Sequence, residues 1–110
     1  MKKIAFITGA TSGIGYSVSK ILAKDYALIL CGRRELRLKN IKDELSKITE
    51  VYTLCYDIRD NESLNKSFES LPTEWKKVYI LINNAGNAHG MDLIHEGRIS
   101  DWDAMIDINV

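Results

Sequence analysis

The chain has 110 residues, of which 45% are hydrophobic and 27% charged, with seven glycines and one proline. This composition excludes collagen-like, low-complexity and intrinsically disordered chains, and the length allows a single domain with one hydrophobic core. Fifteen basic residues balance fifteen acidic ones, so the net charge does not favour nucleic acid or an anionic membrane as a partner. No apolar run reaches the roughly 20 residues that cross a bilayer and no signal peptide is recognisable, so we expect a cytoplasmic protein.

Segments typical of strands and helices alternate along the chain. Apolar runs predict buried strands at Ile4–Thr8, Ala27–Cys31, Val51–Tyr56 and Val78–Ile82. Apolar residues at helical spacing predict the buried faces of three intervening helices: Ile14, Val18, Ile21 and Leu22; Leu38, Ile41, Leu45 and Ile48; and Leu64, Phe68 and Leu71. The third of these helices has Asp60 or Asn61 as its expected N-cap, and Pro72 closes it.

The last third of the chain has weaker patterns. We expect loop with a short helical turn from Asn87 to Arg98, followed by a helix that Ser100 caps and that carries Trp102, Met105 and Ile106. The alternation of strand and helix implies an α/β fold, with a parallel sheet, right-handed crossovers and helices on both faces.

The cysteines and histidines do not have the spacing of a metal or redox motif. Cys31 and Cys55 lie in apolar surroundings, and we interpret them as reduced core thiols rather than a disulfide. His89 and His95 are six residues apart with no third ligand nearby in sequence, so no metal site is predicted. We expect His89 to be an exposed loop residue.

A glycine-rich segment, Thr8-Gly9-Ala10-Thr11-Ser12-Gly13-Ile14-Gly15, joins the first strand to the first helix. Such a turn directs free backbone N–H groups and the positive end of the helix dipole at one point, which suits a pyrophosphate. Gly9 would allow the tight turn, Gly13 the approach of the phosphate and Gly15 the close packing of the helix. Thr11 and Ser12 add hydroxyl donors. The alternative is a plain glycine-containing turn without a ligand.

Two other nucleotide-binding classes fit this turn less well. A P-loop NTPase would have lysine where Tyr16 follows Gly15. A methyltransferase that binds S-adenosylmethionine would have an acidic residue at the end of the second strand, where Gly32 stands.

The end of the second strand also bears on the cofactor. An acidic residue there would bind the ribose 2′-hydroxyl of NAD, whereas this chain has Gly32-Arg33-Arg34. Because the guanidinium fork matches phosphate oxygens, the two arginines favour NADP. The alternative is a solvated charge pair, although arginine is unfavourable beside a helix N-terminus.

Four motifs now stand in a fixed order: TGATSGIG after the first strand, Asp57 after the third, Asn83-Asn84-Ala85-Gly86 after the fourth and Asn109 in the last helix. In this combination the chain resembles the N-terminal half of the short-chain dehydrogenase/reductase family, most closely its bacterial NADP-dependent 3-hydroxy acid (serine) dehydrogenases. The resemblance implies a Rossmann-type doubly wound parallel sheet with strand order 3-2-1-4, truncated after the fourth strand and the start of the next helix. Residues 1–110 would then form an incomplete NADP-binding Rossmann domain.

The resemblance also implies roles for individual residues. Gly9, Gly13 and Gly15 would hold the cofactor diphosphate, with a backbone contact from Ile14. Asp57 would read the adenine amino group and Ile58 would pack on the base, while Asn83, Asn84, Ala85 and Gly86 would pass along the adenine ribose. Asn109 would be the catalytic asparagine whose carbonyl holds a water of the proton relay; without the family pattern it would be interpreted as a helix residue facing the core. In the family geometry, the alternative to an exposed loop position for His89 is the substrate side of the nicotinamide.

The family's chemistry depends on a tyrosine, a lysine four residues beyond it and a serine, which the resemblance places after the last helix of this chain. The implied function is hydride transfer between NADP(H) and a secondary alcohol or ketone, with a small hydroxy acid as the expected substrate. The 110-residue chain alone is expected to be inactive. The alternatives are a non-catalytic NADP-binding or interaction fragment and a structural fragment that binds nothing. We also expect a homo-oligomer, because the fourth strand and the last helix would each leave an apolar surface uncovered.

Overall fold

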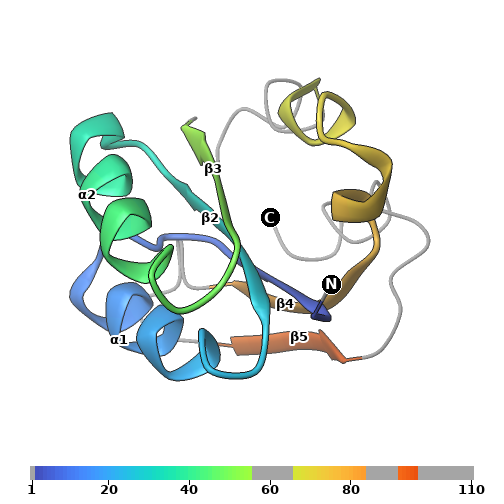
Figure 1. Cartoon of the computed structure of the whole chain (residues 1–110), viewed down its shortest axis with the longest axis horizontal. Helices are drawn as coiled ribbons and strands as arrows, with labels where there is room; N and C mark the ends of the chain where they lie inside the picture. Colours follow the sequence, from blue (N-terminus) through green and yellow to red (C-terminus); the bar gives the residue numbers. More distant parts are fainter. Residues whose placement is uncertain (1, 56–65, 84–91, 97–110) are drawn as a thin grey trace.

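The computed structural model describes residues 2–55, 66–83 and 92–96 (Figure 1). It contains two helices, a short helical segment at 66–69 and one 3₁₀ helix within these ranges. In chain order the elements are β1 (Ile4–Ile7), α1 (Gly13–Leu22), β2 (Ala27–Gly32), α2 (Glu35–Leu45), β3 (Val51–Cys55), η1 (Thr73–Lys76), β4 (Val78–Asn83) and β5 (Asp92–Glu96). The predicted strands are confirmed to within one residue at their described ends, while the predicted last helix lies outside the described residues.

The strands form one sheet in the order β3-β2-β1-β4-β5. The first four are mutually parallel, which confirms the α/β fold with strand order 3-2-1-4. The fifth strand overturns two expectations, because β5 lies within the segment predicted to be loop and pairs antiparallel with β4. Pairing satisfies backbone N–H and C=O groups that an uncovered β4 edge would expose. The β4 edge is therefore not available for the self-association predicted from it.

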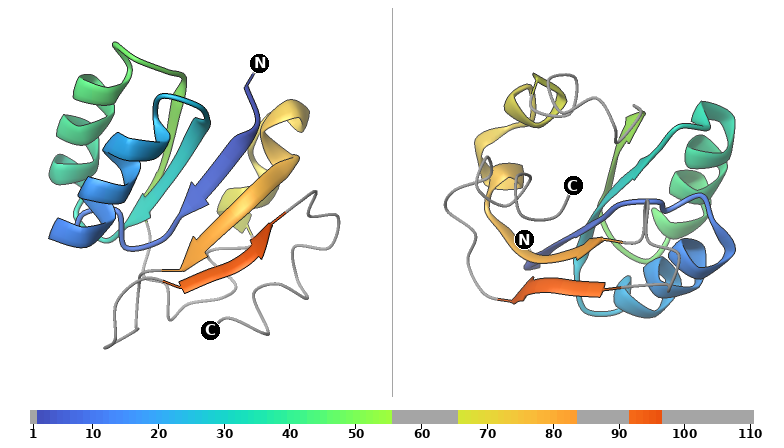
Figure 2. Two further views of the ribbon diagram at one scale, coloured as in Figure 1. Left: turned by 90° about the horizontal axis from the view of Figure 1, so that it is seen from below. Right: turned by 180° about the vertical axis from the view of Figure 1, so that it is seen from behind.

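Helices cover both faces of the sheet (Figure 2). Helices α1 and α2 lie on one face, and the helical segments between residues 66 and 76 lie on the other. Successive residues of β1 alternate between the two cores, with Ile4 and Phe6 in one and Ala5 and Ile7 in the other. Because β1 is buried on both faces, its sequence is a continuous apolar run rather than an alternating one.

Helix α1 packs on the sheet through a different row of residues from the one predicted. Gly15, Ser19 and Ala23 are buried, whereas Ile14 and Ile21 are 54% and 68% exposed. The three buried residues are small and four apart, so they form a stripe that lets the helix approach the strands closely. The predicted face was therefore wrong for both isoleucines, while Val18 and Leu22 do pack against the core from its margin.

Helix α2 buries three of the four residues predicted for its inner face. Leu38, Ile41 and Leu45 lie in the core beneath it. Ile48 follows the end of the helix and is 52% exposed, so its assignment to the buried face was wrong. Residues beyond the helical end no longer continue its 3.6-residue period.

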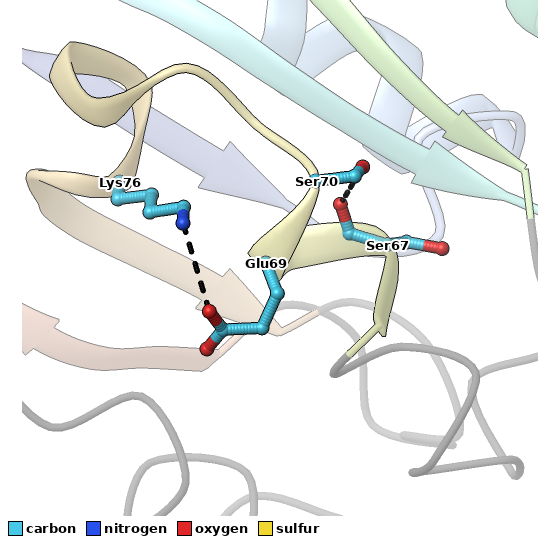
Figure 3. Close-up of polar contacts among 4 residues, drawn as sticks. All are labelled: Ser67, Glu69, Ser70 and Lys76. Atoms are coloured by element: carbon cyan, nitrogen blue, oxygen red, sulfur yellow. Dashed lines mark hydrogen bonds and ion pairs between the residues drawn. The ribbon is translucent and has the colours of Figure 1, made fainter.

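The other face of the sheet is covered by the chain around Pro72. Phe68 and Leu71 are buried as predicted, and Leu64 and both candidate N-caps lie outside the described residues. The helix does end before Pro72, but η1 follows at once and adds Trp75 to the core, edge-on to Tyr52. Two polar contacts hold this region: Lys76 Nζ lies 3.6 Å from Glu69 Oε2, and the Ser70 hydroxyl donates to the Ser67 carbonyl at 2.6 Å (Figure 3).

The two cysteines are both free thiols, as expected, but only one is in the core. Cys31 is buried in β2, whereas Cys55, at the end of β3, is exposed. The thiol of Cys55 donates to the Arg33 carbonyl at 3.6 Å. In the described ranges, no helix combines the length and apolar character required to cross a bilayer.

Candidate functional site

The glycine-rich turn lies at the carboxyl edge of the parallel strands, between the end of β1 and the start of α1. The backbone of the turn is hydrogen-bonded to β4 and β2, the two strands beside β1. Thr8 N–H donates to the Ile82 carbonyl of β4 and Ala10 N–H donates to the Cys31 carbonyl of β2, each at 3.0 Å. The turn is thus fixed above the centre of the sheet, the position at which open α/β sheets bind ligands.

Two glycines give the turn its shape. Gly9 has a φ of 61°, a left-handed conformation that other residues rarely adopt. A Cβ on Gly15 would lie 2.1 Å from the Gly9 carbonyl oxygen and 2.9 Å from the Ala10 Cα. Helix α1 therefore touches the backbone of the turn, and this contact requires glycine at residue 15.

Ser12 closes the turn as the N-cap of α1. Its Oγ accepts from Gly15 N–H at 3.0 Å and donates to the Gly9 carbonyl at 2.9 Å. Both contacts lie within the turn, so this hydroxyl proton is engaged by a carbonyl rather than presented to a ligand. Ser12 therefore has a capping role in the structure, and its role as a hydroxyl donor to a ligand stays a prediction.

The first residues of α1 present donors and open space together. No acceptor among the described residues bonds to the N–H groups of Gly13 or Ile14. A Cβ built on Gly13 would have no atom within 4 Å. The protein's own packing therefore does not require glycine at residue 13, in contrast to residue 15. Exposed N–H donors at a helix N-terminus favour an anion, because the helix dipole adds its partial positive charge.

The end of β2 adjoins this turn. A Cβ on Gly32 would lie 2.9 Å from Thr11 Cγ2, so Gly32 and Thr11 are in close contact. Arg33 and Arg34 follow and are both exposed. The structure thus brings the glycine-rich turn and the arginine pair to the same edge of the sheet, as their positions after β1 and β2 predict.

Arg34 is also the N-cap residue of α2, and its side chain makes no capping hydrogen bond. A serine, threonine, aspartate or asparagine in that position would stabilise a helix by about 0.5–2 kcal/mol relative to a residue that cannot cap. The arginine is therefore poorly suited to helix stability. This weakens the interpretation of Arg33 and Arg34 as an ordinary solvated pair.

One spacing in the chain could be mistaken for the family's catalytic pair. Tyr16 and Lys20 stand four residues apart on α1, a spacing that our interpretation of the sequence overlooked. The Tyr16 hydroxyl donates to both carboxylate oxygens of Glu44 at 2.7 Å, and this hydrogen bond raises the pKa of Tyr16. Lys20 Nζ lies 4.7 Å from the centroid of the Tyr16 ring rather than beside its oxygen. The pair therefore lacks the arrangement that the resemblance assigns to the catalytic residues, in which the lysine lowers the pKa of the tyrosine.

The remaining candidate residues fall largely outside the described residues. These are Asp57, Ile58, Asn84, Ala85, Gly86, Asn109 and His89. Asn83 ends β4, and His95 lies in β5. Within the described part of the chain, no three histidine, cysteine or acidic residues form a group that could hold a metal ion.

The four parallel strands and the strand–turn–helix geometry define an α/β protein of the Rossmann type. Residues 3–110 match the family described as short chain dehydrogenase, and the chain belongs to this family. It is 42% identical over 107 residues to a probable NADP-dependent dehydrogenase in the aabA 3′ region of Dichelobacter nodosus, a match that covers 96% of this chain and 99% of that protein.

Longer relatives match over the same region. The NADP-dependent 3-hydroxy acid dehydrogenase YdfG of Escherichia coli K12 is 38% identical over 107 residues, which cover 96% of this chain and 42% of the relative. The closed form of serine dehydrogenase complexed with NADP⁺ superposes with a TM-score of 0.71 and 38% identity, over 94% of this chain and 42% of that structure. The chain thus spans less than half the length of these two proteins.

Proposed function

We propose that the chain binds NADP(H) at the carboxyl edge of its sheet and forms the cofactor-binding half of an oxidoreductase. The observation that carries this proposal is the open space at Gly13 beside the N–H groups of Gly13 and Ile14. A diphosphate can approach this backbone without displacing a side chain. The NADP-dependent relatives support the same assignment.

The arginines give the proposal its cofactor preference. Arg33 and Arg34 would bind the 2′-phosphate of NADP, while Gly32 leaves no carboxylate to bind the ribose 2′-hydroxyl of NAD. A carboxylate at residue 32 would repel the phosphate and would also contact Thr11. From the resemblance, Asp57 and Ile58 would hold the adenine, residues 83–86 the adenine ribose, and Asn109 a catalytic water.

When bound, NADP(H) supplies or accepts the hydride of the reaction. The residues of this chain would bind and orient it: the turn at the diphosphate, and the arginines at the 2′-phosphate. We propose a secondary alcohol or ketone as the substrate and a small hydroxy acid as its class, following the 3-hydroxy acid and serine dehydrogenases that the chain is similar to.

Titration calorimetry with NADP⁺ and NAD⁺ tests the binding proposal. A charge-assisted hydrogen bond contributes about 1.5–3 kcal/mol, so the chain should prefer NADP⁺ by about ten- to a hundredfold. The Arg33→Ala variant should lose most of this preference while keeping its affinity for NAD⁺. Equal affinity of the unaltered chain for the two cofactors would refute the role of the arginines.

The 110-residue chain is proposed not to turn over substrate by itself. The purified chain should therefore show no NADP-dependent oxidation of serine, allo-threonine or 3-hydroxy acids above background. Measurable turnover would mean that these residues contain the acid–base chemistry that the resemblance places beyond them.

The homo-oligomer stays a prediction that now depends on the last helix, because β5 covers the β4 edge. Light scattering at micromolar concentration distinguishes the homo-oligomer we expect from a monomer. A folded monomer with a cooperative thermal transition would refute the prediction.

A further inference from the structure

Helix α2 reaches across to the glycine-rich turn through Arg37, in its first turn. The Nε of this side chain donates to the Thr11 carbonyl oxygen at 2.6 Å, between residues 26 positions apart in sequence. Arg37 is exposed, so the contact adds little to the buried core. The contact instead joins the Arg37 side chain of α2 to the backbone of the glycine-rich turn.

Thr11 is the residue of the turn that α2 and β2 both touch. Its carbonyl accepts from Arg37, and its side chain lies against Gly32. The neighbouring Ala10 N–H is bonded to β2, and Ser12 N–H is bonded to the Gly9 carbonyl. Two carbonyls, those of Ala10 and Thr11, lie between these N–H groups along the chain, and Arg37 holds the second of them. The Thr11 carbonyl and the Ser12 N–H belong to one planar peptide. Arg37 and the Ser12–Gly9 hydrogen bond therefore together oppose rotation of this carbonyl toward a bound phosphate, which it would repel.

A second contact from the same helix holds the residue after the turn. Glu44 is seven positions after Arg37, about two helical turns, and therefore lies on the same side of α2. Its carboxylate accepts from the Tyr16 hydroxyl at 2.7 Å. Helix α2 accordingly contacts the glycine-rich turn at Thr11 and the first part of α1 at Tyr16.

We propose that Arg37 is a positioning residue for the diphosphate-binding turn. By holding the Thr11 carbonyl, it keeps the N–H groups of Gly13 and Ile14 oriented toward the diphosphate. This inference rests on the proposed function for its ligand, and on the described contacts for its geometry. Arg37 acts on the turn, whereas Arg33 and Arg34 act on the 2′-phosphate. The two roles make different predictions about cofactor preference.

The test compares Arg37→Gln with Lys39→Gln, which removes the same charge from an exposed residue of the same helix. Amide exchange measured by NMR without cofactor reports the turn directly. In Arg37→Gln the Gly15 amide should exchange about tenfold faster, the effect expected from losing one charge-assisted hydrogen bond. The Phe6 amide of β1 should be unchanged, as should every amide of the turn in Lys39→Gln. Unchanged Gly15 exchange in Arg37→Gln would overturn the proposal.

Cofactor titration then separates positioning from phosphate binding. Arg37→Gln should weaken NADP⁺ and NAD⁺ by the same factor, at least about fivefold, with their ratio preserved. A loss confined to NADP⁺ would overturn the proposal and make Arg37 a 2′-phosphate ligand. A third outcome is possible: the unaltered chain binds neither dinucleotide, but the Gly15 amide still exchanges faster in Arg37→Gln. In that case the proposed function is refuted, and the positioning of the turn by Arg37 is supported.

Discussion

Replacing Gly13 and Gly15 separately by alanine should separate ligand binding from folding. The two residues belong to one motif, but the structure places them in opposite environments. A Cβ at residue 15 meets the Gly9 carbonyl oxygen at 2.1 Å, and a Cβ at residue 13 meets nothing within 4 Å. Gly15→Ala should therefore damage the fold, while Gly13→Ala should damage only the binding of a ligand that lies over the turn.

The stability difference follows from these contacts. To restore ordinary contact, α1 or the turn must retreat by roughly 1 Å or more against backbone atoms, and overpacking of this kind costs about 3 kcal/mol. For a domain of this size the melting temperature should fall by about 12 °C. Gly13→Ala has no such conflict and gains up to about 1 kcal/mol of helix propensity, so its melting temperature should stay the same or rise by about 4 °C.

For NADP⁺ affinity, in contrast to stability, Gly13→Ala is the variant that should be directly affected. A methyl group on residue 13 keeps a diphosphate from the N–H groups of Gly13 and Ile14, and losing one charge-assisted hydrogen bond weakens binding about ten- to a hundredfold. Circular dichroism melts and calorimetric titration with NADP⁺ measure both quantities on the same samples. Unchanged NADP⁺ affinity in Gly13→Ala would refute the placement of the diphosphate, and an unchanged melt in Gly15→Ala would refute the close contact of α1 with the turn.

Arg34→Ser should supply the missing N-cap of α2, raising the free energy of unfolding by about 0.5–2 kcal/mol in denaturant titrations while weakening NADP⁺; a variant no more stable than the parent would argue against the capping deficit. Bound NADP⁺ should slow the reaction of the exposed Cys55 thiol with a disulfide reagent, whereas buried Cys31 should stay unreactive either way; an unchanged Cys55 rate would place the adenosine end elsewhere. The hydrogen bond to the Glu44 carboxylate raises the pKa of Tyr16 above 10.0, so from neutral pH to pH 10 this bond stabilises the fold fully, and its contribution is lost as the pH rises through the raised pKa. The stability difference between the parent and Tyr16→Phe should accordingly be constant from neutral pH to pH 10 and shrink above it.

The four parallel strands could be predicted from the sequence because each is a short, mainly apolar run. The runs of β1 and β2 are continuous because these strands are buried on both faces, whereas β3 at the edge is only partly buried. The place of the glycine-rich turn and of the arginine pair followed from topology alone, since the carboxyl ends of parallel strands meet at one edge. β5 was missed because Asp92–Glu96 is short, polar at both ends and defined by pairing with β4 rather than by its own pattern.

The face of α1 shows why periodicity can mislead. Ile14 and Ile21 have helical spacing, and so does the row Gly15, Ser19 and Ala23. Hydrophobicity favours the isoleucines, but the distance between helix and sheet decides, and only small residues fit that distance. Contacts such as Arg37 to Thr11 leave no signal in a single sequence, because they join a side chain to a backbone carbonyl whose direction depends on the fold.

The position of β1 in the middle of the sheet has a consequence for synthesis on the ribosome. β1 pairs with β2 soon after both emerge, but its other edge waits for β4, and Thr8 and Ile82, which join the two strands, are 74 residues apart. At about 5–20 residues per second, that edge stays unpaired for roughly 4–15 s during elongation. Nascent chains therefore pass through a stage in which α1, α2 and three strands can assemble while one edge of β1, a strand with only apolar side chains, is unpaired. Chaperone capture or misassembly should concentrate in that interval.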